Sequence, residues 1–316
     1  MTKPTPKIGI TSVSFSKNPT LVSELNQHFR DTTINTTGRV LNENELLAAL
    51  HDADAAIVGT EPITDALLAQ LPNLKFISKY GVGMDNIDLA ACHKHTVAVG
   101  WTGGVNKTAV AEMTLGFMIS LCRNLFLTSQ QLKSGIWNKN GGVQLGGKTV
   151  GIIGAGYIGQ ELIRLLAPFH CRILINDIID QSEYIALVGA TAVSKDVLFR
   201  ESDIVTIHTP LTPETHHLIT ADTLALMKPT AFLINTARGR IVDLNALKIA
   251  LKNGIIAGAA LDTYDYEPPT DIDLLQLPNL ICTPHIGGNS VEAALAMGRS
   301  AIGHLREYFS FISLST

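Results

Sequence analysis

Three segments in the second half of the chain place a reactive side chain just after an apolar, strand-like run. The side chains are Arg238, Glu267 and His285, in segments 235–239, 260–269 and 283–288. A guanidinium can hold a carboxylate through two hydrogen bonds, and an imidazole can give and take a proton near neutral pH. A carboxylate can orient that imidazole and stabilise its charged form. Together these groups could support proton-coupled reduction of a 2-oxo acid.

Each of these residues also has an ordinary structural interpretation. Arg238 could be a surface ion-pair residue, Glu267 a turn residue and His285 a loop histidine. Asp265 is the main alternative to Glu267 as the carboxylate partner. Gly239 follows the arginine and an apolar strand precedes it, so we expect Arg238 in a strand-end loop. Ligands of open parallel sheets bind at the carboxyl ends of strands, so the three loops could converge on one crevice.

A glycine motif in the middle of the chain predicts a dinucleotide site. It reads G-A-G-Y-I-G, with glycines at Gly154, Gly156 and Gly159, and it joins an expected strand directly to an expected helix. The first glycine permits the tight turn, the second lets the pyrophosphate approach, and the third lets the helix pack closely. The backbone amides of Tyr157 and Ile158 would face the phosphates at the helix N-terminus.

Asp177 extends this prediction to the choice of cofactor. It ends the next expected strand, near the spacing at which a carboxylate binds the adenosine ribose hydroxyls. A carboxylate there would repel the 2'-phosphate of NADP, and residues 178–181 offer no arginine to receive that group. The motif therefore favours NAD. The alternative is that Asp177 is a strand-end cap and that the glycines only form turns.

Short β-branched runs alternate with helix-period segments along the chain, which indicates an α/β fold with largely parallel sheets. We expect strands near 7–11, 55–59, 76–79, 97–99, 149–153, 172–176, 203–208, 231–235, 257–261 and 280–283. We expect helices near 43–51, 64–71, 108–131 and 291–309, with N-caps at Thr64 and Asp88. The last six strands would fill one doubly wound sheet.

The position of the glycine motif also sets the expected domain order. Because the motif lies near the middle of the chain, residues 1 to about 100 must do something other than bind the dinucleotide pyrophosphate. They could form the substrate side of the site. We expect two doubly wound parallel-sheet domains. A Rossmann NAD-binding domain (101–285) would be inserted in a flavodoxin-like substrate domain (1–100 with 286–316).

Composition narrows the class of partner. The 316 residues are 46% hydrophobic and carry a net charge of -4, which argues against a nucleic-acid surface. No apolar stretch reaches the ~20 residues of a bilayer crossing. The beginning of the chain has no signal-peptide pattern, and the four cysteines form no CxxC pair. We expect a cytoplasmic protein with a small-molecule partner and no metal site.

The chain resembles the D-isomer-specific 2-hydroxyacid dehydrogenase family, which includes phosphoglycerate, glycerate and D-lactate dehydrogenases. The matching segments, in order, are 79–86, 106–112, the glycine motif, 208–212, 227–229, 235–243, 261–268 and 284–288. The resemblance implies an NAD-dependent enzyme in which Arg238 holds the substrate carboxylate and carbonyl and His285 is the general acid/base. Glu267 would fix the imidazole tautomer and raise its pKa.

The resemblance also implies further contacts. Backbone amides around Val82 and Gly83 would bind the substrate carboxylate. The nicotinamide ribose side would be lined by His208, Thr236, Ala237, Asp262, Gly287 and Gly288. A homodimer formed through the region 108–142 is also expected from the resemblance.

The substrate stays open at this point. Candidates are 3-phosphoglycerate with phosphohydroxypyruvate, hydroxypyruvate, glyoxylate, or a bulkier 2-oxo acid. Glu61 lies in a loop where phosphoglycerate enzymes of the family often place arginine, although Lys79 and Lys107 could compensate. Oxidation of formate is disfavoured, because related formate dehydrogenases lack the Glu267-type partner. A different class, an NAD(H)-sensing corepressor that binds short peptides without turnover, is the alternative.

Overall fold

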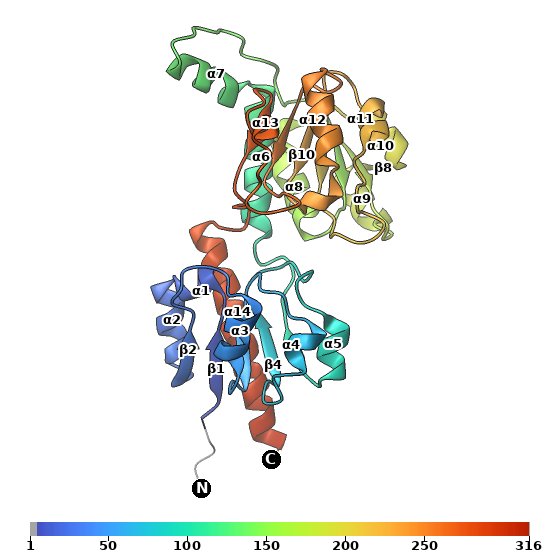
Figure 1. Cartoon of the computed structure of the whole chain (residues 1–316). Helices are drawn as coiled ribbons and strands as arrows, with labels where there is room; N and C mark the ends of the chain where they lie inside the picture. The colour runs from blue at the N-terminus through green and yellow to red at the C-terminus, as the bar shows by residue number, and fades with distance from the viewer. Residues whose placement is uncertain (1–4, 316) are drawn as a thin grey trace. The chain divides into compact units, whose positions relative to one another are not determined.

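The structure, a computed structural model, describes residues 5–315, with side chains up to residue 310. The chain divides into two compact units (Figure 1). The first consists of Met1–Asn106 with Asn289–Thr316, and the second is Lys107–Gly288. The sequence placed the boundaries a few residues earlier, at 100/101 and 285/286.

The first unit is built on a five-stranded parallel sheet in the order β2-β1-β3-β4-β5. Its strands are β1 (Lys7–Ile10), β2 (Asp31–Ile34), β3 (Ala55–Val58), β4 (Phe76–Lys79) and β5 (Ala98–Gly100). Its helices are α1 (Val13–Ser16), α2 (Pro19–Asn26), α3 (Glu43–Leu50), α4 (Asp65–Leu68), α5 (Leu89–Lys94) and α14 (Val291–Ser315). This strand order is flavodoxin-like, and ligands of such sheets bind where the order reverses, between β1 and β3.

Helices cover both faces of this sheet. Leu46, Leu67 and Cys92, from α3, α4 and α5, belong to the core on one face. Residues of α1, α2 and α14 form the core on the other face. Helix α14 packs on β4, where the Ser78 hydroxyl donates to the carbonyl of Ala301 over 2.8 Å. The final helix of the chain therefore completes the first unit.

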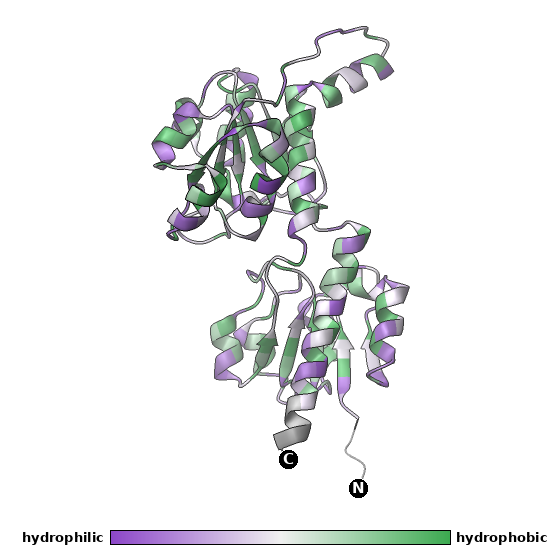
Figure 2. Ribbon diagram, turned by 180° about the vertical axis from the view of Figure 1, so that it is seen from behind, coloured by the Kyte–Doolittle hydropathy of each residue, from purple (hydrophilic) through white to green (hydrophobic). Residues whose placement is uncertain are grey.

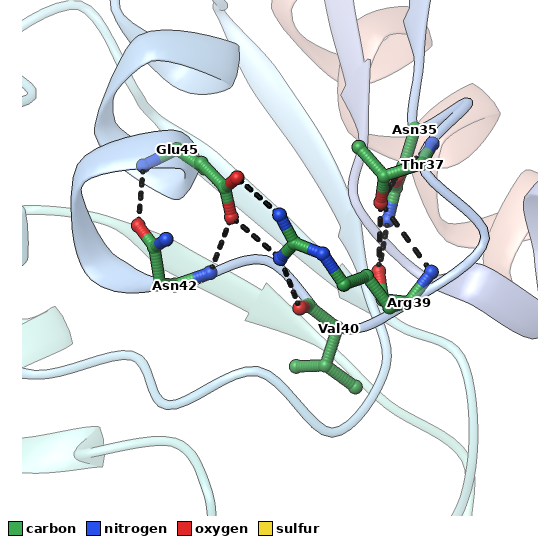
Figure 3. A network of polar contacts seen from close by, with 6 residues as sticks. All are labelled: Asn35, Thr37, Arg39, Val40, Asn42 and Glu45. Carbon is green, nitrogen blue, oxygen red and sulfur yellow. Dashed lines mark hydrogen bonds and ion pairs between the residues drawn. The ribbon is translucent and has the colours of Figure 1, made fainter.

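Local polar contacts fix the helix starts. Thr64 and Asp88 cap α4 and α5 through their side chains, which confirms both predicted N-caps. Asn42 and Glu45 form a capping box at α3, and Glu45 also binds Arg39 through two hydrogen bonds (Figure 3). The loop after β2 is thus tied to the helix that follows it.

The second unit contains a seven-stranded parallel sheet in the order β12-β11-β10-β9-β6-β7-β8. The strands are β6 (Thr149–Ile153), β7 (Arg172–Asn176), β8 (Thr191–Ala192), β9 (Ile204–Ile207), β10 (Phe232–Asn235), β11 (Gly258–Leu261) and β12 (Leu280–Cys282). The order is that of a Rossmann sheet with one further strand. Strands of both sheets are mostly hydrophobic, whereas the helices carry both polar and apolar residues (Figure 2).

The helices of the second unit also lie on both faces of the sheet. They are α6 (Lys107–Cys122), α7 (Leu125–Lys133), α8 (Tyr157–Leu166), α9 (Ser182–Val188), α10 (Lys195–Glu201), α11 (Ala221–Leu226), α12 (Leu244–Lys252) and α13 (Ile272–Leu275). Residues of α6, α8 and α9 form one core cluster, and residues of α10, α11 and α12 form the other.

The structure corrects three expectations about elements. Strands β2 and β8 were not predicted, so the sheets have five and seven strands rather than four and six. The expected helix 108–131 is two helices, because Asn124 adopts a left-handed conformation with φ of 52°. Within the described residues no single helix is long and apolar enough to cross a membrane, although α6 and α7, which are bent by 64° at the break between them, together have the length and apolar character for a span.

Candidate active site

The three loops with reactive side chains follow adjacent strands of the second unit. Strands β10, β11 and β12 pair in parallel, so their carboxyl ends lie at the same edge of the sheet. The loop after β10 carries Arg238, the loop after β11 carries Glu267, and the loop after β12 carries His285.

His285 and Glu267 are in direct contact. The Nδ1 atom of His285 lies 2.8 Å from Oε2 of Glu267, and the two side chains are 43% and 38% exposed. The other carboxylate oxygen, Oε1, accepts a hydrogen bond from the backbone N–H of Tyr264 over 3.1 Å. His285 has a φ of 54°, a conformation that is rare for a residue with a side chain. The carboxylate is thus fixed on one side and presented to the imidazole on the other.

The electrostatics of the pair match this geometry. The hydrogen bond to Glu267 raises the pKa of His285 above its ordinary value, against the effect of burial. Burial opposes ionisation of Glu267, but the hydrogen bond from His285 and the other contacts together lower its pKa. The positive charge of Arg238 contributes to the lower pKa of Glu267 and partly offsets the rise in the pKa of His285. The three predicted side chains therefore lie close enough to influence one another.

Two features hold the Arg238 loop in place. The buried side chain of Asn235 donates to the carbonyl of Arg238 over 2.8 Å and accepts from the N–H of Ala237 over 3.0 Å. Gly239 lies against the backbone of Tyr264, where an added Cβ would be 2.0 Å from the carbonyl carbon. The glycine is therefore required for close contact between the Arg238 and Glu267 loops.

Asp262 holds the loop that carries His285. Its carboxylate is 1% exposed. One oxygen accepts from the Thr283 hydroxyl over 2.6 Å and from the N–H of Ile286 over 2.8 Å. The other accepts from the N–H of Gly287 over 2.8 Å. Asp262, Gly287 and Gly288 were expected on the nicotinamide side. In the structure Asp262 also fixes the backbone at Gly287.

The glycine motif has the local geometry that a bound dinucleotide needs. Gly154 has a φ of 93°, and an added Cβ would be 2.7 Å from the carbonyl oxygen of His208. A Cβ on Gly156 would meet open space, whereas one on Gly159 would lie 2.3 Å from the carbonyl oxygen of Gly154. The N–H groups of Tyr157 and Ile158, at the start of α8, donate no hydrogen bond to any described residue.

Asp177 and His208 flank this motif. One oxygen of Asp177 accepts from the N–H of Ala155 over 2.7 Å and the other from the N–H of Ile179 over 2.9 Å. A carboxylate has about four acceptor positions, so both oxygens can accept further hydroxyl groups. Burial lowers the pKa of His208 to about 3, and its Nδ1 has no partner in the described part of the chain. These groups fit an NAD molecule.

Thr236 and Ala237 directly follow β10. The Thr236 hydroxyl is buried and lies 3.2 Å from the hydroxyl of Thr114 in α6. Val82 and Gly83 belong to the other unit, in the loop after β4, and both are half-buried.

Some functional candidates were not predicted. The backbone of Tyr264 and the side chains of Asn235 and Thr283 position the predicted groups, but residue types alone do not predict these contacts. A polar residue at the end of an apolar strand, as at Asn235, was the only available signal. Asp265, the rival carboxylate, has a buried Oδ1 without a hydrogen-bond partner among residues 5–315, while Glu267 makes the contact to His285.

Comparison with known proteins agrees with this architecture. Residues 115–287 match the family model described as D-isomer specific 2-hydroxyacid dehydrogenase, NAD binding domain. The chain belongs to the D-isomer specific 2-hydroxyacid dehydrogenase family. As a member, it is an NAD-dependent oxidoreductase that acts on the CH–OH group of a 2-hydroxy acid.

Individual relatives cover most of the chain. A glyoxylate reductase from Thermofilum pendens is 39% identical over 84% of this chain and 80% of its own length. A D-3-phosphoglycerate dehydrogenase from Methanocaldococcus jannaschii is also 39% identical, over 82% of this chain, which spans only 50% of that protein. The solved structure of D-lactate dehydrogenase from Aquifex aeolicus, complexed with NAD and lactic acid, has a TM-score of 0.84 and 27% identity. It covers 96% of both chains.

Proposed function

We propose that this dehydrogenase interconverts a small, unphosphorylated 2-oxo acid and its 2-hydroxy acid, with glyoxylate and hydroxypyruvate as the leading candidates. The observation that carries the chemistry is the 2.8 Å contact between His285 and Glu267 beside Arg238. It supplies a proton donor with a raised pKa next to a cation that can bind a carboxylate.

The proposed roles follow from the contacts. Bound NADH would supply the hydride to the carbonyl carbon. His285 would give its proton to the carbonyl oxygen, while Arg238 holds the oxygen and the substrate carboxylate. Glu267 keeps the proton of Nδ1 in place and stabilises the imidazolium that is needed before reduction. In oxidation, neutral His285 would take the proton from the hydroxyl group.

The cofactor contacts form part of the same proposal. The amides of Tyr157 and Ile158 would bind the pyrophosphate, and Asp177 would bind the adenosine ribose. The nicotinamide side would be formed by His208, Thr236, Ala237, Asp262, Gly287 and Gly288. The unpaired amides at the start of α8 and the unpaired Nδ1 of His208 support these assignments.

The carboxyl edge of the first sheet supports an unphosphorylated substrate. The cations of the nearby loops are already engaged. Lys17 donates to the carbonyl of Gly38, and Arg39 binds the Glu45 carboxylate (Figure 3). Lys79 is 5% exposed and bonded to neighbouring groups. A phosphate group would have to displace these contacts in order to bind the cations, so they argue against phosphohydroxypyruvate.

Glu61 adds a second argument against a phosphorylated substrate. It is 1% exposed and lies in the loop after β3, beside the point where the strand order reverses. A buried carboxylate near a ligand site disfavours a dianion. It also occupies the loop in which phosphoglycerate enzymes often carry arginine.

A substrate panel tests this proposal. NADH consumption is measured with glyoxylate, hydroxypyruvate, pyruvate and phosphohydroxypyruvate. We expect the highest kcat/KM with one of the first two, and preference for phosphohydroxypyruvate would overturn the substrate class. His285→Gln should lower kcat by about 10²- to 10⁴-fold while NADH binding, followed by fluorescence titration, is retained. NADH binding without turnover of any 2-oxo acid by the wild type would favour the corepressor alternative.

We also propose that the enzyme is a homodimer and that it is cytoplasmic. Helix α7 has no buried residue, and it projects with the loop after it from the body of its unit (Figure 1). Leu132, Ile136 and Trp137 in this region are 56%, 54% and 77% exposed, and such an apolar patch is typical of an interface. Light scattering should give twice the chain mass of 33.9 kDa. Trp137→Ser should weaken the dimer, and a monomeric wild type would refute this assignment.

A further inference from the structure

The loop after β4, residues 80–85, is closed at its base by a pair of side chains. Lys79 precedes the loop and Asn86 follows it, and the Lys79 ammonium lies 2.5 Å from Oδ1 of Asn86. Both side chains also donate to one acceptor, the backbone carbonyl of Gly59 in the loop after β3. The two ends of the loop are therefore held together and anchored to the neighbouring strand end.

Glu61 completes this cluster of buried polar groups. The side-chain carboxylate of Glu61 accepts from the N–H of Gly59 over 2.5 Å. The backbone carbonyl of Glu61 accepts from Nδ2 of Asn86 over 2.6 Å. Lys79 and Glu61 thus bind the C=O and the N–H of the same residue, Gly59. Burying two charges is costly unless they are compensated and hydrogen-bonded, so the contacts to Gly59 and Asn86 favour one arrangement of the cluster, although Oε1 of Glu61 has no hydrogen-bond partner among residues 5–315.

The loop itself presents backbone amides from this fixed base. Gly81 has a φ of 120°, which a residue with a side chain rarely adopts. The carbonyl of Val82 accepts from the indole N–H of Trp101 over 2.8 Å. The N–H groups of Val82 and Gly83 donate to no acceptor within residues 5–315. A constrained loop with unpaired successive amides is a ready site for an anion.

We propose that Lys79 is a positioning residue for substrate binding. Together with Asn86 and Glu61, it holds the loop so that the amides of Val82 and Gly83 are preorganised for the substrate carboxylate. Lys79 acts through the backbone and does not itself bind the substrate. This inference rests on the proposed function, in which those two amides take the carboxylate. Preorganised donors bind an anion without the cost of ordering the loop.

The test compares Lys79→Met with Lys79→Arg. Methionine keeps the length and apolar stem but removes the ammonium, whereas arginine restores a cation that can donate to Gly59 and Asn86. For Lys79→Met we expect KM for the preferred 2-oxo acid, and the inhibition constant of the unreactive analogue oxamate, to rise about 10- to 100-fold. That is the loss expected for one charge-assisted hydrogen bond. The kcat should change less than KM, and Lys79→Arg should recover most of the loss.

Lys75→Met is the matched control. Lys75 is an exposed lysine just before the same strand, and its ammonium donates to the carbonyl of Pro72 and to no other acceptor within the described side chains. It should leave KM and the oxamate constant unchanged. NADH affinity, measured by fluorescence, should stay the same in all variants, because the proposed cofactor residues belong to the other unit.

The outcomes separate this inference from the function on which it rests. If the wild type reduces no 2-oxo acid, the proposed function fails. If the wild type is active but Lys79→Met keeps KM and the oxamate constant within twofold, the positioning role is refuted. A parallel loss of kcat and NADH affinity would indicate a general structural defect and would also refute it. If Lys79→Met does not fold, Trp101→Phe decides, since it removes the hydrogen bond to Val82 and should raise KM about 3- to 10-fold.

Discussion

Replacing Glu267 with glutamine should move the pH dependence of the enzyme. The carboxylate binds the N–H of Tyr264 with Oε1 and His285 with Oε2. If glutamine keeps its oxygen on Tyr264, its NH₂ group faces Nδ1 of His285. That arrangement favours the neutral tautomer with its proton on Nε2 and disfavours the imidazolium. If the amide turns over, two donors meet at Tyr264. The first arrangement removes the hydrogen bond that raises the pKa of His285, and the second keeps an acceptor for Nδ1–H but removes the negative charge, so both lower that pKa.

The direction of the change follows from the roles of the two protonation states. Reduction needs protonated His285, so kcat/KM for reduction is high below the raised pKa and falls as pH increases through it. In Glu267→Gln the pKa drops, and this fall should occur at lower pH. Oxidation needs the neutral imidazole, so its rise with pH should also move to lower pH. Reduction therefore suffers most on the alkaline side, while oxidation is comparatively spared.

The expected size comes from the exposure of the pair. A hydrogen bond to a charged group contributes about 1.5–3 kcal/mol. Because the side chains of His285 and Glu267 are 43% and 38% exposed, solvent screens the contact and the lower end applies. About 1.4 kcal/mol corresponds to roughly tenfold, so we expect an about tenfold lower kcat/KM for reduction at pH values above the raised pKa of His285.

The assay is kcat/KM against pH in both directions, with Asp265→Asn as the matched control. Asp265 is the neighbouring carboxylate, but the contact with His285 is made by Glu267, so replacing Asp265 should leave both pH limbs where they are. An unmoved profile in Glu267→Gln, with activity within twofold of the wild type, would show that Glu267 does not set the protonation of His285. A shift in Asp265→Asn instead would transfer that role to the rival residue.

Three further substitutions test other parts of the site. Arg238→Lys should lower kcat/KM about 10- to 100-fold through loss of a bidentate contact, and unchanged substrate kinetics would exclude a carboxylate fork. Asp177→Ala should raise KM for NADH about tenfold and reduce the preference for NADH over NADPH, so an unaltered cofactor ratio would contradict the ribose contact. Gly239→Ala should cost about 1–3 kcal/mol of stability by calorimetry and also reduce kcat, because its Cβ would meet the Tyr264 backbone; a wild-type melting curve would disprove that contact.

The sequence predicted the elements that have strong apolar runs and missed those that lack them. Strand β2 reads D-T-T-I, has no fully buried residue and lies at the sheet edge, so it carries no apolar signal. Strand β8 has two residues, both exposed. The apolar pattern continues across Asn124, where the chain changes direction through a left-handed residue. Pattern reasoning could not locate that break, because asparagine is also compatible with a helix interior.

The candidate site shows a similar division. The types of Arg238, Glu267 and His285 suggest chemistry, and their positions after strands place them at one sheet edge. The choice of Glu267 over Asp265 for the contact with His285 depends on the turn between 264 and 267, which residue types do not specify. The left-handed backbone of His285 depends on contacts to Asp262, a residue more than twenty positions away.

Asn235 and Asp262 explain how a loop site can keep a fixed geometry. Both are buried at strand ends, and both use their polar atoms to hold the loops that carry Arg238 and His285. A buried polar group without a hydrogen bond is costly. Each loop is therefore held in the position in which its backbone or side chains bond to the buried Asn235 or Asp262. The rigidity of the site therefore comes from the sheet.

The hydrogen bonds that Asp262 makes to its own loop limit how many more it can accept from a cofactor. A carboxylate oxygen accepts about two hydrogen bonds. Oδ1 already accepts from Thr283 and Ile286, whereas Oδ2 accepts from Gly287 alone among the described residues. One acceptor position on Oδ2 thus remains for a donor on the nicotinamide side. Asp262→Asn would replace one acceptor oxygen with an NH₂ group, which would face either the N–H of Gly287 or the donors on Oδ1. We therefore expect weaker NADH binding and misplacement of His285 to occur together, and a variant that loses only one of these would separate the two roles.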